Sequence, residues 1–161
     1  MEQALTPLYE IFKLNSRLYL NCLEDMDEDQ ARWRPNGQTN SAAFVALHLL
    51  DSRFFIARTM GIEHVSPFAA MTEGKRSIED MQDMPSIEQL RTTWRDITGE
   101  IRERFKALSA ADLSRAIDTK LPLENKTLLG VLSFLLQHDS FHLGQLALLR
   151  KQMGLQAMSY R

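Results

Sequence analysis

The sequence predicts an all-α protein, a four-helix bundle with a long crossover between the second and third helices. Four long segments repeat apolar residues at a spacing of three and four, which is the pattern of an amphipathic helix. No segment shows the alternation typical of a strand. The connection over residues 61–85 is too long for a tight helix-to-helix turn, so it is expected to run back along the bundle.

Size and composition favour one domain over residues 1–161. The formal net charge is −2, so no broad basic field would attract nucleic acid or an anionic membrane. No apolar run is long enough to cross a bilayer, and the first residues lack the basic and apolar regions of a secretory signal. Cys22 is the single cysteine, which favours a reducing, cytoplasmic setting.

The first helix is predicted from Leu5 to Leu23. Its expected buried face carries two polar side chains, Asn15 and Tyr19, which leave two interpretations open. Asn15 could bond to a neighbouring helix while Tyr19 reaches the surface, or both could line a functional cavity. The residues of this expected buried face are Leu8, Ile11, Phe12, Asn15, Tyr19 and Leu23. A short helical turn is expected over residues 27–32, followed by Trp33, which is expected to seal one end of the core.

The second helix is predicted from Asn40 to Met60, capped by Asn40 or Ser41 and ended by Gly61. Its expected buried face includes His48 and consists of Ala43, Phe44, Leu47, His48, Ser52, Phe55 and either Arg58 or Thr59. Asp51 lies one turn beyond His48. It is either an acceptor that orients an imidazole or an exposed acid, and the sequence favours neither.

The crossover carries His64, which is expected to be an exposed loop residue. The third helix is predicted to start at Ser86, where Gln89 completes a capping box, and its apolar stripe contains Trp94 and Phe105. A short helical turn is expected at residues 109–112, and residues 120–125 are expected to form a loop.

The last helix is predicted from Thr127 to Met153, with Gly154 in the position of a C-terminal glycine. His138 and His142 lie one turn apart on one face, within a stripe expected to point at the core. Two buried imidazoles disfavour charge and still need partners, and a divalent metal satisfies both conditions. Alternatively, they are core histidines bonded to Gln145, Tyr19 or the backbone.

His48 is the expected third ligand, because both histidine positions fall at middle depth in their helices. Three protein ligands leave positions open for water or substrate, as in catalytic zinc sites. The intervening residues, Asp139, Ser140 and Phe141, include no glutamate at the position where zinc proteases of the H-E-x-x-H type carry their general base.

The segment His138-Asp139-Ser140-Phe141-His142-Leu143-Gly144-Gln145 resembles the last-helix motif of the DinB-like family, which includes the YfiT-type proteins classed as metal-dependent hydrolases. Two further segments, Ala46-Leu47-His48-Leu49-Leu50 and Trp33-Arg34-Pro35, are similar to the family's pattern, and the resemblance extends from Leu8 to Gly154. Leu143 departs from it, because a basic residue is frequent there.

The resemblance implies an up-down-down-up bundle, often homodimeric, in which His48, His138 and His142 bind a divalent metal, commonly zinc or nickel. It further implies either a thiol-dependent transferase that uses a low-molecular-weight thiol as cosubstrate, or a hydrolase. The alternative is a non-catalytic metal-binding or dimerisation protein. Asn15, Tyr19, Asp51 and Gln145 are the residues proposed to surround the ligands or line the substrate site; no general base can be named.

Overall fold

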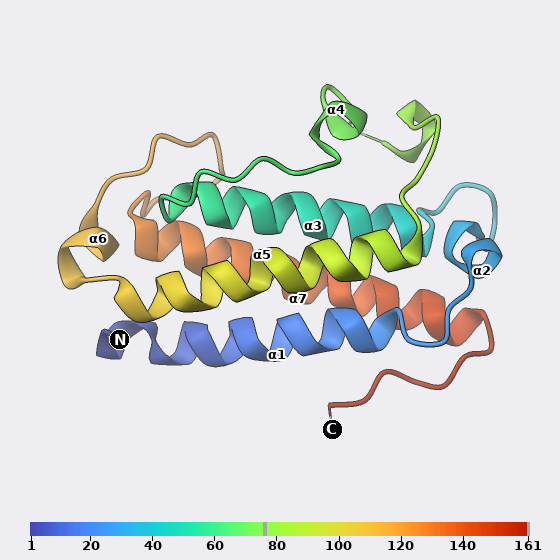
Figure 1. Cartoon of the computed structure of the whole chain (residues 1–161), viewed down its shortest axis with the longest axis horizontal. Helices are drawn as coiled ribbons and strands as arrows, with labels where there is room; N and C mark the ends of the chain where they lie inside the picture. Colours follow the sequence, from blue (N-terminus) through green and yellow to red (C-terminus); the bar gives the residue numbers. More distant parts are fainter. Residues whose placement is uncertain (76, 161) are drawn as a thin grey trace.

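The computed structural model describes residues 1–75 and 77–160, and four long helices dominate it (Figure 1). They are α1 (Thr6–Cys22), α3 (Ala42–Thr59), α5 (Ile87–Ala107) and α7 (Leu128–Gln152). In Figure 1, α1 and α7 run in one direction and α3 and α5 in the other, so the order along the chain is up-down-down-up. The predicted fold class is confirmed.

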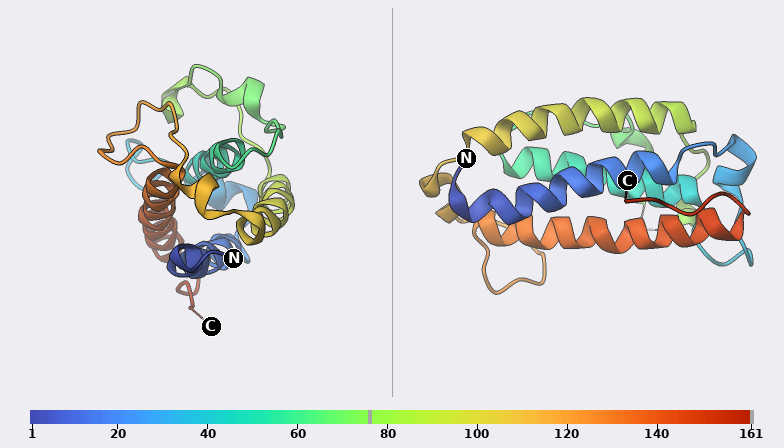
Figure 2. Two further views of the ribbon diagram at one scale, coloured as in Figure 1. Left: turned by 90° about the vertical axis from the view of Figure 1, so that its left-hand side faces the viewer. Right: turned by 90° about the horizontal axis from the view of Figure 1, so that it is seen from below.

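The four helices form a ring around one apolar core, as the end-on view in Figure 2 shows. α1 packs on α7, α7 on α3 and α3 on α5, while α1 and α5 close the ring with fewer contacts. In the described part of the chain there is no strand, only an isolated antiparallel bridge between Ala116 and Thr127. No described helix is long and apolar enough to cross a bilayer.

In the described part of the chain, five short helices lie outside the four long ones, before α1 or in the connections. They are η1 (Gln3–Leu5), α2 (Glu28–Arg32), α4 (Ala69–Thr72), η2 (Ile78–Asp80) and α6 (Ala110–Ser114). The crossover that contains α4 and η2 runs over the outer side of α3 in Figures 1 and 2. Its length follows from the topology, because α3 and α5 are parallel and the chain must return to the starting end of the bundle.

Local capping sets the helix ends as predicted. Ser41 Oγ accepts from the Phe44 amide at 3.2 Å, and Thr127 Oγ1 accepts from the Gly130 amide at 3.3 Å. Ser86 and Gln89 form a complete capping box at the start of α5. Such caps satisfy backbone donors that have no partner within the helix.

The buried face of α5 is confirmed, whereas the predicted face of α3 is only partly right: Ala43, Leu47, Ser52 and Thr59 are buried, but other members are not. On α3 the positions turned outward include His48 and Arg58, which are exposed, and Phe44 and Phe55, which are half-buried. α3 is apolar on nearly every side, so the sequence period cannot define which face is buried. Two single residues were also placed wrongly: Ile11 is 39% exposed, and Trp33, expected to seal the core, is 40% exposed.

Candidate metal centre

Three histidines from the antiparallel pair α3 and α7 meet at one point. Nε2 of His138 lies 3.1 Å from Nε2 of His48 and 3.1 Å from Nε2 of His142. One nitrogen from each ring can be chosen so that all three lie within 4.8 Å of one another. His48 and His138 are 90 positions apart in the chain, so packing of α3 against α7 creates the cluster.

The cluster lies at the rim of the bundle rather than in its core. His48 is exposed and His138 and His142 are half-buried, so the prediction that His48 is buried is wrong. The core-facing positions on this part of α7 belong instead to Leu135, Asp139 and Leu143. The histidines follow along the edge of that stripe, where α7 meets α3, and this position leaves the cluster open to solvent.

The surroundings keep two of the rings neutral. Although the His48 side chain reaches the surface, its ring is partly desolvated by the atoms packed around it, and this disfavours the charged form and lowers its pKa to about 4; the neighbouring imidazoles of His142 and His138 add to the effect. Burial also lowers the pKa of His142, against a hydrogen bond that its ring donates to Gln145 and that favours its protonation. Neutral imidazole is the form that binds a metal.

Gln145 orients the His142 ring. Its Oε1 lies 2.7 Å from His142 Nδ1, and because an amide oxygen only accepts, Nδ1 must carry the proton. Neutral His142 therefore presents an unprotonated Nε2 to the centre of the cluster. Gln145 is one of the residues expected to surround the histidines, and the structure places it there.

The donor set fits a divalent cation. Tetrahedral coordination with zinc-to-nitrogen bonds of about 2.0–2.1 Å puts neighbouring ligand atoms roughly 3.3–3.4 Å apart. The two Nε2 separations of 3.1 Å are close to that spacing. Nδ1 of His138, turned away from the cluster, is buried and has no hydrogen-bond partner among the described residues. The three rings thus bring one nitrogen each close enough together to hold a divalent cation.

A buried ion pair lies next to the cluster, and the sequence analysis missed it. Asp139 Oδ2 is 3.0 Å from Arg53 Nη2, with both side chains 0% exposed. Asp139 Oδ1 accepts from Ser52 Oγ at 3.0 Å and lies 4.0 Å from His138 Nδ1. The signal was available in the spacing: Asp139 follows Leu132 and Leu135 by seven and four positions on the core-facing stripe of α7.

Aromatic rings hold the Arg53 guanidinium from both sides. Its central carbon lies 4.5 Å from the Phe12 ring and 4.3 Å from the Trp94 ring. Tyr19 stacks on Trp94, with 3.8 Å between the two ring centroids. These faces supply favourable contacts to a buried cation that makes few hydrogen bonds.

Asn15 and Tyr19 form hydrogen bonds between helices, and among the described residues neither is hydrogen-bonded to one of the three histidines. Asn15 Nδ2 donates to the Leu136 carbonyl and to Ser140 Oγ, each at 3.0 Å, on another side of α7. Tyr19 is fully buried and donates to the Ala46 carbonyl at 3.2 Å. Its burial raises the pKa of the phenol well above the ordinary value. Asn15 therefore fits the helix-bonding interpretation, whereas the expectation that Tyr19 reaches the surface is wrong.

Asp51 lies beside the cluster in a cleft of about 260 Å³ that His48 also lines. It is half-buried, and burial raises the pKa of its carboxyl group, against a hydrogen bond from Thr72 and the charge of Arg58. Among the described residues, the Asp51 carboxyl group forms no hydrogen bond or ion pair with an imidazole. His64 does not line this cleft. Its exposed ring lies 2.9 Å from the carboxylate of Glu100, and an exposed position is what was expected for this loop residue.

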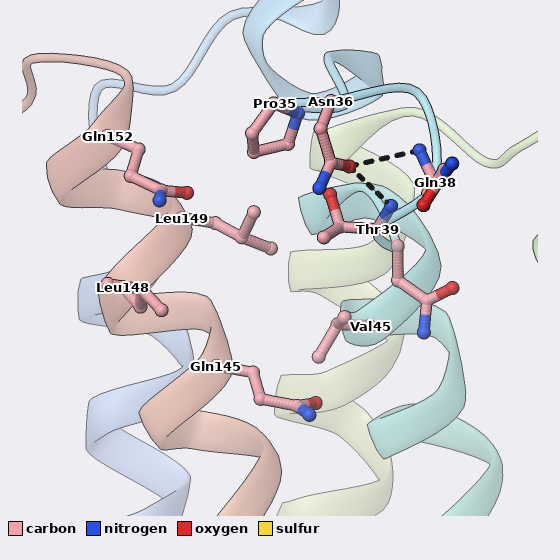
Figure 3. A pocket seen from close by; sticks show the side chains of 10 residues that line it. Pro35, Asn36, Gln38, Thr39, Val45, Gln145, Leu148, Leu149 and Gln152 are labelled. Carbon is pink, nitrogen blue, oxygen red and sulfur yellow. Dashed lines mark hydrogen bonds between the residues drawn. The ribbon is translucent and has the colours of Figure 1, made fainter.

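A second cleft, of about 390 Å³, opens next to Gln145 (Figure 3). It lies between the C-terminal half of α7, the start of α3 and the loop that precedes α3. Its lining consists of Pro35, Asn36, Gln38, Thr39, Asn40, Val45, Gln145, Leu148, Leu149 and Gln152. Of the two clefts, one is thus lined by His48 of the cluster and the other by Gln145, which bonds to His142.

The fold and the cluster agree with what comparison of the sequence shows. The family model of the DinB superfamily matches residues 11–146, so this chain belongs to that superfamily. The match includes all three clustered histidines. A search of curated proteins finds no match.

One solved structure supports the fold independently. The chain is similar to a DinB-like protein from Bacillus subtilis, with a TM-score of 0.68 and 19% sequence identity over 96% of each chain. At that identity the likeness concerns the fold alone.

Proposed function

We propose that this chain is a metal-dependent enzyme in which His48, His138 and His142 hold a divalent cation, zinc or nickel. The observation that carries the proposal is the convergence of three imidazole Nε2 atoms at the rim of the bundle. A purely structural role would not require the cluster to lie at an exposed edge, with His48 lining one cleft and Gln145, the partner of His142, lining another. Three protein ligands also leave coordination positions for a substrate.

The reaction proposed is a thiol-dependent group transfer, with a low-molecular-weight thiol as cosubstrate, or hydrolysis of a small molecule. A divalent cation supplies the chemistry for either, because it lowers the pKa of a bound thiol or water. The protein's part is to hold His48 and His142 as neutral imidazoles, which bind the cation without reducing its charge as a carboxylate ligand would. The low pKa of His48 and the hydrogen bond from His142 to Gln145 both serve that purpose. Asp51 is the one carboxylate among the described residues that line the cleft with His48.

The test is turnover by protein loaded with zinc or nickel. Small thiols would be offered with an electrophilic aryl halide, and a nitrophenyl ester would be offered without thiol. Metal-dependent turnover that is lost in His142→Ala and kept in His64→Ala supports the proposal. Absence of turnover with every pair, in protein shown to hold the metal, would oppose it.

A second candidate function is a non-catalytic dimerisation module, and two exposed side chains favour a homodimer. Phe141 and Leu148 are 59% and 60% exposed and lie two turns apart on α7, although Leu148 also lines the cleft beside Gln145. Light scattering would give the mass in solution, and Phe141→Glu is expected to shift a dimer toward monomer. A dimer without metal-dependent turnover would favour this second function.

A further inference from the structure

The cleft of Figure 3 is unusual in its chemistry. None of its ten lining residues is charged, although charged residues make up 25% of the chain. Five of the ten carry a side-chain amide: Asn36, Gln38, Asn40, Gln145 and Gln152. Four are apolar, among them Val45 and Leu149, and the tenth is Thr39. Such a lining offers hydrogen bonds and apolar contact but no counter-ion, so it disfavours a charged ligand.

The loop side of the cleft is held in place by its own hydrogen bonds. Asn36 Oδ1 accepts from the backbone amides of Gln38 at 3.0 Å and Thr39 at 2.9 Å, as the dashed lines in Figure 3 show. The amide oxygen of Asn36 is therefore occupied, while its NH₂ group has no hydrogen-bond partner among the described residues. A fixed donor of this kind suits a carbonyl oxygen of a ligand.

The helical sides of the cleft continue directly into the histidine cluster. Val45 comes three residues before His48 on α3, and Gln145 comes three residues after His142 on α7. Because α3 and α7 are antiparallel, both steps lead in the same direction along the bundle. Three helical residues correspond to about 4.5 Å. Gln145 belongs to both places, since it lines the cleft and bonds to His142.

We propose that this cleft binds the non-reacting part of the substrate, and that the substrate is an uncharged, amide-bearing small molecule whose reacting end lies at the histidine cluster. This inference rests on the proposed metal-dependent function, because only that function makes the cleft a substrate site. The volume of about 390 Å³ lies at the low end of the range for small-molecule sites, which fits a compact ligand.

The test compares two probes that differ in one group, N-acetyl-leucinamide and N-acetyl-leucine. Both offer an amide and an isobutyl group, but the second carries a carboxylate. Binding would be followed by chemical shifts of the backbone and side-chain amides in metal-free protein. The amide is expected to shift residues of the cleft and to bind about tenfold more tightly than the acid, since the carboxylate would find no partner there. Equal affinity, or no binding of the amide, overturns the inference.

A charge introduced into the lining should alter that preference. Gln152 is exposed at the C-terminal end of α7, so Gln152→Lys adds a cation where helices favour one and leaves the core untouched. The variant is expected to bind the acid more tightly and to lose the tenfold preference for the amide. Gln137→Lys makes the same change on the exposed face of α7 outside the cleft and should keep it. Identical behaviour of the two variants overturns the inference.

Repeating the titration with metal separates this inference from the proposed function. Cobalt is paramagnetic, so a probe seated in the cleft of cobalt-loaded protein should show faster proton relaxation, and His142→Ala should remove that effect. If the protein binds no metal, the proposed function fails while binding of the amide to the cleft can still be observed. If the metal binds and the amide does not, the inference alone fails.

Discussion

Asp139 and Arg53 form an ion pair inside the bundle, with 3.0 Å between Oδ2 and Nη2 and no exposed surface on either side chain. Desolvation of the pair costs free energy, and the aromatic faces on Arg53 together with the Ser52 hydroxyl on Asp139 offset part of that cost. The pair joins α3 to α7 beside His138. It therefore helps to set how the two histidine-bearing helices pack.

Removing one partner of this pair should be strongly destabilising. Arg53→Met leaves the Asp139 carboxylate buried without its cation, and we expect the free energy of unfolding to fall by about 3–5 kcal/mol. Urea denaturation measures the loss. The double variant with Arg53→Met and Asp139→Leu removes both charges and should recover much of it. A double variant less stable than Arg53→Met would contradict the argument.

Metal binding should raise thermal stability. A ligand that binds only the folded state at 100 times its Kd adds about 2.7 kcal/mol, which corresponds to roughly 5–10 °C in Tm for a domain of this size. Zinc or nickel added to metal-stripped protein is expected to give a shift of this order in a thermal melt. Elemental analysis of the purified protein would identify the metal.

The fourth histidine provides the control for that melt. His48→Ala and His142→Ala should each abolish most of the metal-induced shift, whereas His64→Ala, on an exposed loop, should retain it. An unchanged melting curve for metal-treated wild-type protein would count against the site.

The stability of metal-free protein should fall between pH 6.5 and pH 4. The pKa of His48 is lowered from 6.5 to about 4, so in that window the unfolded chain binds a proton that the folded chain does not. Stability then rises with pH through the window, and it is lost as the pH drops. The lowered pKa of His142 acts in the same direction.

Urea denaturation in chelator at pH 7 and pH 5 measures this dependence. His48→Gln should reduce the difference between the two pH values, and His64→Gln should leave it unchanged. Equal pH dependence in wild-type and His48→Gln protein would contradict the assignment. With metal present, the lowered pKa of His48 should help to preserve affinity at pH 6, because that ring remains neutral there, and the lowered pKa of His142 acts in the same direction.

Loss of the Gln145 amide should weaken the metal site without removing a ligand. Gln145→Leu leaves His142 Nδ1 without its acceptor, and outer partners of this kind typically account for 10–100-fold in metal affinity. Calorimetric titration with zinc would measure the change. Gln137→Leu alters an exposed glutamine of the same helix and should have no effect. Similar affinities for both variants would show that Gln145 does not orient the ring.

Sequence patterns predicted the helices well because capping residues mark where these helices start or end. Ser86 with Gln89 marks the start of α5, and Gly154, at φ +80°, follows the end of α7. These signals are local, so they survive whatever the helix packs against. The meeting of His48 with His138 and His142 was also predictable, since the positions match in depth along antiparallel helices.

Burial was harder to predict than helix position. α3 is apolar on nearly all sides, so its period does not show that His48 faces outward while Arg53 faces the core. Arginine and aspartate are rarely buried, so the sequence gives no sign that Arg53 is buried, and the place of Asp139 on the apolar stripe of α7 does not identify its partner. The cleft beside Gln145 was unpredictable for a similar reason, because it joins a loop to two helices far apart in the sequence.

Two glycines of α7 should respond oppositely to alanine, and they provide a direct test of the packing at the start of that helix. A Cβ at Gly130 would lie 2.1 Å from the backbone carbonyl oxygen of Asn125, and backbone cannot move aside as a flexible side chain would. Gly130→Ala is therefore expected to be destabilising, with a shifted loop before α7.

A Cβ at Gly144 meets nothing within 4 Å among the described residues, and the position is exposed. Gly144→Ala should raise the free energy of unfolding by up to about 1 kcal/mol, because alanine favours the helix. Urea denaturation of both variants measures the contrast, and a stabilising Gly130→Ala would show that the loop does not approach α7 so closely.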